Sequence, residues 1–549
     1  MNRVSCLVLA IAAASATARA QEHQHGTAGQ LGTVNFSNSC SVEAQPKFAE
    51  GMALLHSFEF GQAIDAFKAV AAQDGGCGIA YWGMALAQWG NPFAAGAKPA
   101  NLLLAGRDYV ARGKAAGAKT ERERDYLAAA AALYDNLETV DQRTRMLAYR
   151  DAMARVAAKY PSDTEAATFH ALALAVCADP ADKTYADQLK AGATLEALWK
   201  TQPQHPGLAH YIIHAYDVPA LAPRAVEAAR RYARIAPAAP HALHMPSHTF
   251  TRLGYWQDSI DTNILSAETA RKAGSLSEEL HAIDYQVYAY LQTAQDAAAK
   301  KLVDTVAASG DPTTPRATAS AAPAAAGMFA QAAVPARYAL ERGAWAEATR
   351  LQVMPTRGMP HAEAMTWFAR GLGAARSGDA VLAKTAVDEL QKLIDRLTEA
   401  KETYWVEQVS IQKLGASAWL ALAEGRRDEA LSTMRTAAAR EDRTEKNAIT
   451  PGPLAPAHEL LGEMLLQVKQ PKEALAEFQK TMAKEPNRFR GVAGAAAAAQ
   501  QAGDTAAARK YYAQLLTICA KADSPGRPEL EAARKATRST AAPPSRSRH

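Results

Sequence analysis

A repeated spacing of 34 residues between histidines constrains the fold of this chain more than any other feature of its sequence. His210 and His244 are 34 positions apart, and so are His214 and His248. Within each pair the spacing is short: His214 follows His210 by four positions, and His248 follows His244 by four. An i, i+4 spacing puts two side chains on one face of a helix. A period of 34 residues fits a stacked unit of two antiparallel helices. The pattern therefore predicts a helical solenoid that presents both pairs to one groove.

The same helical unit recurs along most of the chain. From Phe48 onward, a helix, a turn near Phe58 to Gly61 and a second helix with Ala63 and Phe67 alternate small and aromatic residues. This alternation is typical of two helices that pack closely, because an aromatic side chain needs a small residue opposite it. The composition agrees, since 48% of the residues are hydrophobic but only 7% are aromatic. We expect a large core of Ala and Leu between stacked helices.

The repeats resemble those of tetratricopeptide repeat (TPR) proteins over nearly all of the chain. The unit that carries the resemblance best has Leu461, Gly462, Leu465, Ala474, Ala476, Phe478 and Pro486. The segments HPGLAHYIIHAYD, APHALHMPSHTFTRLGYW, TPGPLAPAHELLGEML and EPNRFRGVAGAA further resemble a largely uncharacterised group of exported bacterial TPR proteins. The resemblance implies an all-α, TPR-type α-solenoid of stacked antiparallel helix hairpins, together with export. It also implies a concave groove that binds a protein, a peptide or a small ligand, and it implies no particular activity.

The N-terminal segment MNRVSCLVLAIAAASATARA predicts a signal peptide over 1–20, because one basic residue precedes an apolar run and an Ala-x-Ala cleavage site. No later stretch offers the ~18 apolar residues that a membrane-spanning helix needs. We therefore expect a protein secreted across the inner membrane, periplasmic or extracellular, with no membrane span. A formal charge of +5, without a basic block before the C-terminal tail, argues against a nucleic-acid partner.

Changes in composition divide the rest of the chain. We expect a flexible leader at 21–39, an N-terminal TPR-like solenoid with the histidine-lined groove at 40–307, a Pro/Ala/Thr-rich loop at 308–327, a C-terminal TPR-like solenoid at 328–522 and a disordered tail at 523–549. The loop is predicted to join two helical halves and to be the first site of proteolysis.

Four cysteines follow the signal peptide. Cys40 precedes the first helix of the first repeat and Cys77 follows its second helix, so the hairpin brings them together. Export permits a disulfide, and we predict one between these two, with Cα atoms ~4.4 to 6.8 Å apart. Cys177 and Cys519 lie in Ala-rich helices and are expected to be small buried residues.

The histidines predict a transition-metal site. Five of the 14 histidines lie between positions 210 and 248, where even scatter along 549 residues would place one. A single His-x-x-x-His is weak evidence for a metal, because a histidine on a helix is usually a solvated or hydrogen-bonded side chain. Neutral imidazoles from adjacent helices, however, are ligands for zinc, copper, iron and nickel. We predict that His210, His214, His244 and His248 share one ion, with His241 and His281 as the next ligands and Asp284 as a further ligand or an orienting group.

The sequence also indicates which metal chemistry to expect. The stretch His244-Met245-Pro246-Ser247-His248 lacks the Glu that zinc proteases use as general base. Pro246 predicts that His244 lies before a helix or at its start. Nitrogen ligands in an exported protein, with Met245 nearby, favour copper slightly over zinc. Two histidine pairs also match dinuclear copper sites by analogy.

Three functions remain open. The chain contains no phosphate-binding loop G-x-x-x-x-G-K-[ST], no G-x-S-x-G and no Cys-x-x-Cys. It is expected to be a metal-binding module, a copper- or iron-dependent oxidoreductase that uses the same histidines, or an interaction scaffold without metal. Asp217, Asp284, Tyr211 and Tyr288 are candidate supporting or substrate-binding groups in an enzyme, and ordinary groove residues otherwise.

Overall fold

The structure is a computed structural model, and it describes residues 30–94, 96–313, 321–353 and 358–538. The predicted signal peptide at 1–20 lies outside the described residues. Over the described ranges the regular structure is α-helical, with two short 3₁₀ helices and no strand. None of these helices is both long enough and apolar enough to cross a membrane.

The helices of the first part of the chain are η2 (Val42–Ala44), α1 (Gln45–His56), α2 (Phe60–Gln73), α3 (Gly78–Trp89), α4 (Ala100–Ala116), α5 (Glu121–Ala131), α6 (Gln142–Lys159), α7 (Thr164–Cys177), α8 (Ala186–Trp199), α9 (Pro206–Ala215), η3 (Ala222–Ala225), α10 (Val226–Ile235), α11 (Pro240–His244), α12 (Pro246–Leu253), α13 (Trp256–Lys272), α14 (Leu276–Gln292) and α15 (Asp296–Ala307).

Those of the second part are α16 (Ala324–Glu341), α17 (Trp345–Ala348), α18 (Pro360–Ser377), α19 (Ala380–Glu399), α20 (Thr403–Ala423), α21 (Arg427–Glu441), α22 (Ala457–Gln467), α23 (Pro471–Lys484), α24 (Phe489–Gln501), α25 (Thr505–Ile518) and α26 (Pro528–Arg538).

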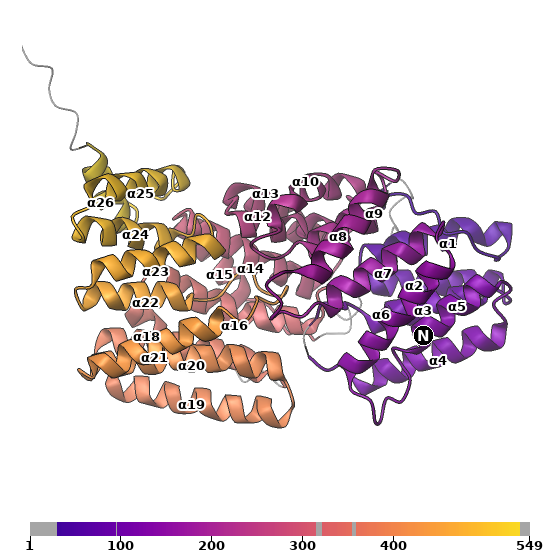
Figure 1. Ribbon diagram of the computed structural model, residues 1–549, viewed down its shortest axis with the longest axis horizontal. Coiled ribbons are helices and arrows are strands. Elements are labelled where there is room, and N and C mark those ends of the chain that lie inside the picture. The colour runs from indigo at the N-terminus through magenta and orange to yellow at the C-terminus, as the bar shows by residue number, and fades with distance from the viewer. Residues whose placement is uncertain (1–29, 95, 314–320, 354–357, 539–549) are drawn as a thin grey trace, which may run out of the picture.

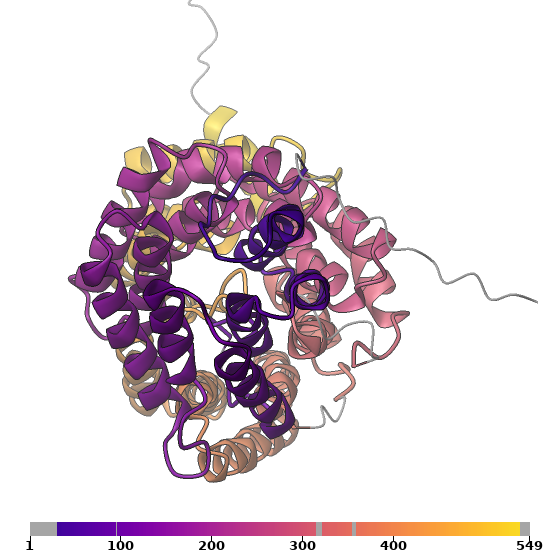
Figure 2. The same cartoon turned by 90° about the vertical axis from the view of Figure 1, so that its right-hand side faces the viewer.

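These helices form the TPR-type α-solenoid that the repeat pattern predicted. Helices that follow one another in the chain pack as antiparallel hairpins, for example α13 on α14 and α18 on α19. Along the long axis of the molecule the hairpins run from the indigo N-terminal end to the yellow C-terminal end (Figure 1). Seen down that axis, they are arranged around a common centre (Figure 2).

Glycines set the close approach of helices within the repeats. The ring of Phe67 on α2 lies against Gly83 on α3, where an added Cβ would be 2.5 Å from a ring carbon. Phe478 on α23 lies in the same way against Gly494 on α24, where the distance would be 2.3 Å. Both rings are fully buried. The small and aromatic residues of the repeat therefore form one packing unit at both ends of the solenoid.

We expect Gly83→Ala to lower the free energy of unfolding by about 1–3 kcal/mol, because the added methyl overpacks a closed site. Alanine is otherwise the better helix former, so the sign of the effect tests the packing and not the helix propensity. Thermal and urea unfolding measure it. Gly75→Ala is the control, because a Cβ at Gly75 has no neighbouring atom within 4 Å. Equal stability of the two variants would contradict this account.

The described part of the predicted leader is packed and not flexible. Leu31, Val34 and Phe36 are all buried, and the ring of Phe36 stacks on Trp82 with centroids 5.2 Å apart. Thr33 also donates its backbone N–H to the carbonyl of Gln204. The prediction of an exposed leader at 21–39 is therefore wrong from residue 30 onward, and 21–29 lie outside the described residues.

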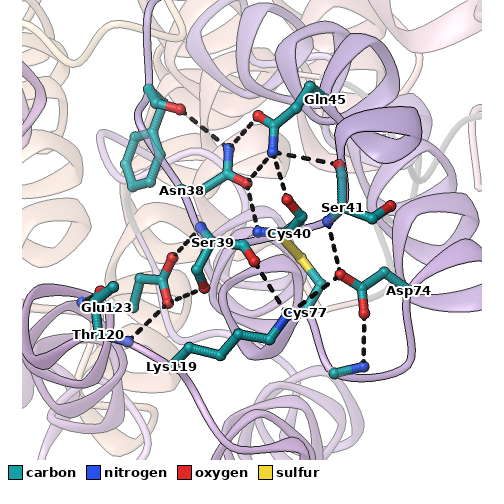
Figure 3. Close-up of a disulfide and its surroundings, with 12 residues drawn as sticks. Asn38, Ser39, Cys40, Ser41, Gln45, Asp74, Cys77, Lys119, Thr120 and Glu123 are labelled. Atoms are coloured by element: carbon teal, nitrogen blue, oxygen red, sulfur yellow. Dashed lines mark hydrogen bonds and ion pairs between the residues drawn. A yellow bond between two sulfur atoms is a disulfide. The ribbon is translucent and has the colours of Figure 1, made fainter.

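A disulfide fastens this segment to the first hairpin. Cys40 and Cys77 are joined with their Cα atoms 4.8 Å apart, inside the range expected from closure of the hairpin. Around it, the backbone N–H and the hydroxyl of Ser39 donate to the carboxylate of Glu123 at 2.6 and 2.7 Å (Figure 3). Cys177 and Cys519 are unpaired and buried, as their positions in Ala-rich helices predicted.

The predicted break at 308–327 does not separate two halves. Residues 314–320 lie outside the described part, but Ala321 and Ala322 are buried and α16 begins at Ala324. Helix α16 packs directly on α14, so the solenoid continues past this loop. A Pro- and Ala-rich composition predicted a flexible connection, but small side chains are also what a closely packed helix entry requires.

The predicted tail at 523–549 begins with an ordered helix. Leu530 and Ala533 of α26 are buried against the end of the solenoid, and Arg527 forms an ion pair with Asp296 at 2.6 Å. Residues 539–549 lie outside the described part. The prediction of disorder is wrong for the residues that pack.

One loop leaves the repeat pattern and runs through the centre of the solenoid. Residues 442–456, between α21 and α22, appear as the orange loop near the middle of Figure 2. Tyr285 of α14 donates its hydroxyl to the carbonyls of Ala448 and Thr450 at 3.1 Å each. We call this segment the central loop. It brings residues of the second half to the inner face of α14.

Candidate metal centre

Four helices bring six histidines to the inner face of the first half. Helix α9 carries His210 and His214, α11 carries His241 and His244, α12 carries His248, and α14 carries His281. Pro246 starts α12 and lacks the backbone N–H that would continue the hydrogen bonds of α11. His244 therefore ends one helix and His248 lies in the next, as Pro246 predicted. All six side chains are at most 8% exposed.

The six side chains form two adjacent triads. The first triad is His210, His214 and His241, and the second triad is His244, His248 and His281; in each, one ring nitrogen per residue lies within 4.8 Å of the others. The triads are neighbours, because the ring centres of His214 and His248 are 5.9 Å apart. This grouping differs from the predicted single site, since the short helix α11 gives one histidine to each triad.

In the first triad, a backbone carbonyl determines the tautomer of one ligand. His210 donates from Nδ1 to the carbonyl of His56 at 2.7 Å, so its Nε2 carries a lone pair. That Nε2 lies 3.2 Å from Nε2 of His241. The Nε2 of His214 has no hydrogen-bond partner among the described residues. The triad therefore presents nitrogens that its surroundings leave available.

In the second triad, the surroundings point two lone pairs at each other. His244 donates from Nδ1 to Asn263 Oδ1 at 2.7 Å, and His248 donates from Nδ1 to Asp217 at 2.9 Å. Asn263 is oriented in turn, because its amide nitrogen donates to the carbonyl of Ser259 at 2.7 Å. The two Nε2 atoms are 3.1 Å apart, close to the ~3.3 Å that two nitrogens ~2.05 Å from one tetrahedral metal would show.

A proton between these nitrogens is the alternative to a metal, and burial opposes it. Burial lowers the pKa of all six imidazoles, and it lowers those of His210 and His281 to about 3. The six rings are therefore neutral near pH 7, which is the state that binds a metal. Two facing lone pairs in a buried site repel each other unless a cation lies between them.

Asp217 connects the second triad to the central loop. Its carboxylate accepts hydrogen bonds from His248 and from Arg252 at 2.9 Å each, and Lys446 of the central loop lies 3.4 Å away. Burial alone would raise the pKa of Asp217, but Lys446 and Arg252 hold it well below its usual value. An ionised Asp217 keeps the proton of His248 on Nδ1 and so orients its Nε2 toward the triad.

Asp284 is not part of either triad. Arg337 of α16 binds its carboxylate at 3.1 Å, and both side chains are buried. Burial raises the pKa of Asp284 although Arg337 opposes the shift. The prediction that Asp284 is a ligand or orients one is therefore not supported by its position. The next residue of α14, Tyr285, lies beside the second triad instead, with its hydroxyl 3.4 Å from Nε2 of His248.

A third group, His56, Glu165 and His205, has metal-like spacing but is held together by hydrogen bonds. His56 and His205 donate from Nε2 to the two oxygens of Glu165 at 2.9 and 2.7 Å. Their Nδ1 atoms accept from Tyr211 and from the backbone N–H of Leu208 at the start of α9. Every ring nitrogen is thus occupied, and the group fixes the His56 carbonyl that orients His210.

We expect Glu165→Gln to lower the free energy of unfolding by about 2–3 kcal/mol at pH 7, because an amide cannot accept from both imidazoles. Burial would raise the pKa of Glu165, but the N–H donors of His56 and His205 hold it well below its usual value. This contribution is therefore present above about pH 4.5 and is lost as the pH falls toward the folded pKa.

Urea unfolding between pH 7 and pH 3 measures the effect, with the exposed Glu43→Gln as control. The wild type should lose more stability than Glu165→Gln as the pH falls. Parallel pH profiles for the two proteins would show that the ionised carboxylate of Glu165 does not stabilise the fold.

Several of these residues were not found from the sequence. Asp217 was noted as a supporting candidate, but His56, Asn263, Tyr285 and Lys446 were not. His56 precedes His210 of α9 by 154 positions, and Lys446 lies in a loop without periodicity. Only a buried polar residue on a predicted apolar helix face, as with Asn263, offers a signal that sequence reasoning could use.

A cavity of about 230 Å³ borders both triads. Its wall includes His214 and His241 of the first triad and His248 and His281 of the second. His210 and His244 are not among the lining residues and lie behind it. A ligand in this cavity would therefore border both triads from one side.

The comparisons with known proteins are distant. No protein-family model matches the chain, and no curated protein matches it. Among solved structures, a human IFIT1 dimer with m7Gppp-AAAA is similar at 10% identity and a TM-score of 0.35, over 81% of this chain and 90% of that one. The P58(IPK) TPR domain covers 91% of this chain and 99% of its own, at 12% identity and a TM-score of 0.21.

Naa15, in a complex with Naa10 and HypK, is similar at 12% identity and a TM-score of 0.22, over 90% of this chain and 73% of that chain. Scores this low support no inference about ligands or partners. The description of the helical repeats and of the two histidine triads therefore depends on the structure of this chain and not on its neighbours.

Proposed function

We propose that this protein binds two transition-metal ions, one in each histidine triad, with copper slightly favoured over zinc. The observation that carries the proposal is the 3.1 Å separation of two Nε2 lone pairs, those of the buried His244 and His248. In the first triad, Nε2 of His210 and Nε2 of His241 are 3.2 Å apart, and no described residue fixes the tautomer of His241. Three imidazoles per ion leave a coordination position open in each triad.

The donor set supports copper or zinc. Each triad offers only neutral nitrogens, and carboxylates enter neither, which suits copper or zinc better than magnesium or calcium. Asp217, Asn263 and the carbonyl of His56 each hold the second ring nitrogen of a ligand, as the supporting groups of metal sites do. These contacts support the proposal that each triad holds an ion.

A metal-dependent oxidoreductase is the second candidate, and the cavity favours it over a storage site. Four of the six ligands reach the cavity wall, so a small molecule has access to both open positions. A site that only stored metal would need no such space. In an enzyme, the ions would supply the redox or Lewis-acid chemistry, and the protein would orient the ligand and exclude water.

Metal analysis of protein purified without an affinity tag tests the proposal. After exposure to micromolar copper or zinc and removal of weakly bound metal, we expect two ions per chain. A protein that retains neither metal would leave the interaction scaffold as the better function. A single ion per chain would limit the proposal to one triad.

We also propose export across the inner membrane, as the N-terminal sequence predicts. The Cys40–Cys77 disulfide supports this location, because such bonds persist mainly outside the cytoplasm. Fractionation of cells that express the full chain, followed by thiol titration, would test it. A reduced protein recovered from the cytoplasm would contradict the proposal.

A further inference from the structure

A stacked pair of aromatic rings lines the cavity beside the triads. His361 of α18 and Trp405 of α20 stack face to face, with ring centroids 3.9 Å apart and planes 4° apart. Both rings line the cavity, and Trp405 is 7% exposed. Phe93 also lines it and stacks on His214 of the first triad at 4.1 Å and 14°. Aromatic rings thus border this space from both halves of the solenoid.

The lining of the cavity is almost free of charge. Among the described residues that line it, Glu402 is the only Asp, Glu, Lys or Arg. Burial lowers the pKa of His361 to about 3, so this ring is neutral as well. In the metal-free protein, an anion would find no positive side chain among the described residues of this wall. The composition therefore favours a neutral ligand.

One polar group in the wall lacks a hydrogen-bond partner among the described residues. Nδ1 of His361 is buried and has no hydrogen-bond partner among the described residues. A buried polar atom without a partner costs free energy, and a ligand with one hydroxyl or amine group could satisfy it. The same ligand ring could stack on the neighbouring aromatic face.

We propose that this cavity binds a small, neutral, planar aromatic molecule with one hydrogen-bonding substituent, of the phenol class. The inference rests on the proposed metal centre, because such a ligand would lie between the aromatic wall and the two triads. Trp405 and His361 would select for the flat ring, and in the metal-free protein the scarcity of charge among the described lining residues would select against carboxylates. The triads would meet the edge of the ligand.

Fluorine NMR with para-fluorophenol tests the binding directly, in protein stripped of metal and in protein loaded with it. We expect para-fluorophenol to bind roughly tenfold more tightly than a fluorinated cyclohexanol, which has the hydroxyl but no flat ring. In the metal-free protein, para-fluorobenzoate, which is flat but anionic, should also bind roughly tenfold more weakly. Equal affinity for the three compounds would overturn the proposal.

Variants locate the binding. Trp405→Leu should weaken para-fluorophenol binding roughly tenfold, whereas Trp367→Leu, at a residue that does not line the cavity, should leave it unchanged. Ala325→Leu is a second test, because it fills part of the cavity and keeps the aromatic pair. Thermal unfolding shows whether each variant is folded. Unchanged binding in folded Trp405→Leu and Ala325→Leu would place the ligand elsewhere and end the proposal.

Metal content separates this inference from the proposed function. Trp405→Leu contacts no triad, so it should keep two ions per chain while it loses the phenol. Two ions per chain without selective phenol binding would overturn only the aromatic site. Selective phenol binding by a wild type that retains no metal would overturn only the metal centre.

Discussion

His214→Ala and His248→Ala should each remove one metal ion and leave the other in place. His214 belongs to the first triad and His248 to the second, so each change reduces one site from three imidazoles to two. We expect each variant to retain about one ion per chain, with the affinity of the damaged site lowered by about 100-fold or more. Metal analysis after equilibrium dialysis measures both values.

The double variant and a control complete this test. His214→Ala/His248→Ala should retain no tightly bound ion, and its helical content should equal that of the wild type because the solenoid core lies elsewhere. His170→Ala is the matched control, since His170 lies on α7 outside both triads. If either single variant lost both ions, the triads would form one site as the sequence predicted.

Arg488→Met should destabilise the protein by about 3–5 kcal/mol, because it leaves two buried carboxylates without their partner. Arg488 is fully buried at the start of α24, where it pairs with Glu341 at 2.6 Å and with Glu459 at 2.8 Å. It also donates to the hydroxyl of Tyr288 at 3.1 Å. One guanidinium thus joins α14, α16, α22 and α24.

Urea and thermal unfolding measure this effect, and a surface pair provides the control. Arg435 and Glu473 form an ion pair at 3.0 Å with both side chains more than half exposed. Arg435→Met should therefore change the free energy of unfolding by no more than about 0.5 kcal/mol. Comparable losses in the two variants would mean that the buried network does not hold the helices together.

The period of the sequence predicted the solenoid but not its ends. The spacing of Gly83 and Phe67 recurs with Gly494 and Phe478, and such local packing can be read from a repeat. The burial of Phe36 cannot, because it depends on Trp82 in a later helix. The tail was misread for the same reason, since a Pro- and Arg-rich composition hides the few residues that pack.

The sequence predicted which histidines lie in the candidate site, but it did not predict that they divide into two triads. The spacing by one helical turn correctly indicated that His210 lies near His214, and His244 near His248. It could not indicate that His241 and His244, on the same short helix, would serve different triads. The groups that orient the rings come from other parts of the chain and follow no period.

The central loop changes how such a molecule would respond to force. A solenoid in which each repeat touches only its neighbours can stretch and twist like a coil spring. Here Lys446 and Tyr285 link the central loop to the opposite side of the coil, with Lys446 3.4 Å from Asp217. Extension would have to break these buried links first. The protein should therefore extend little under a pulling force until these contacts break, and then extend abruptly.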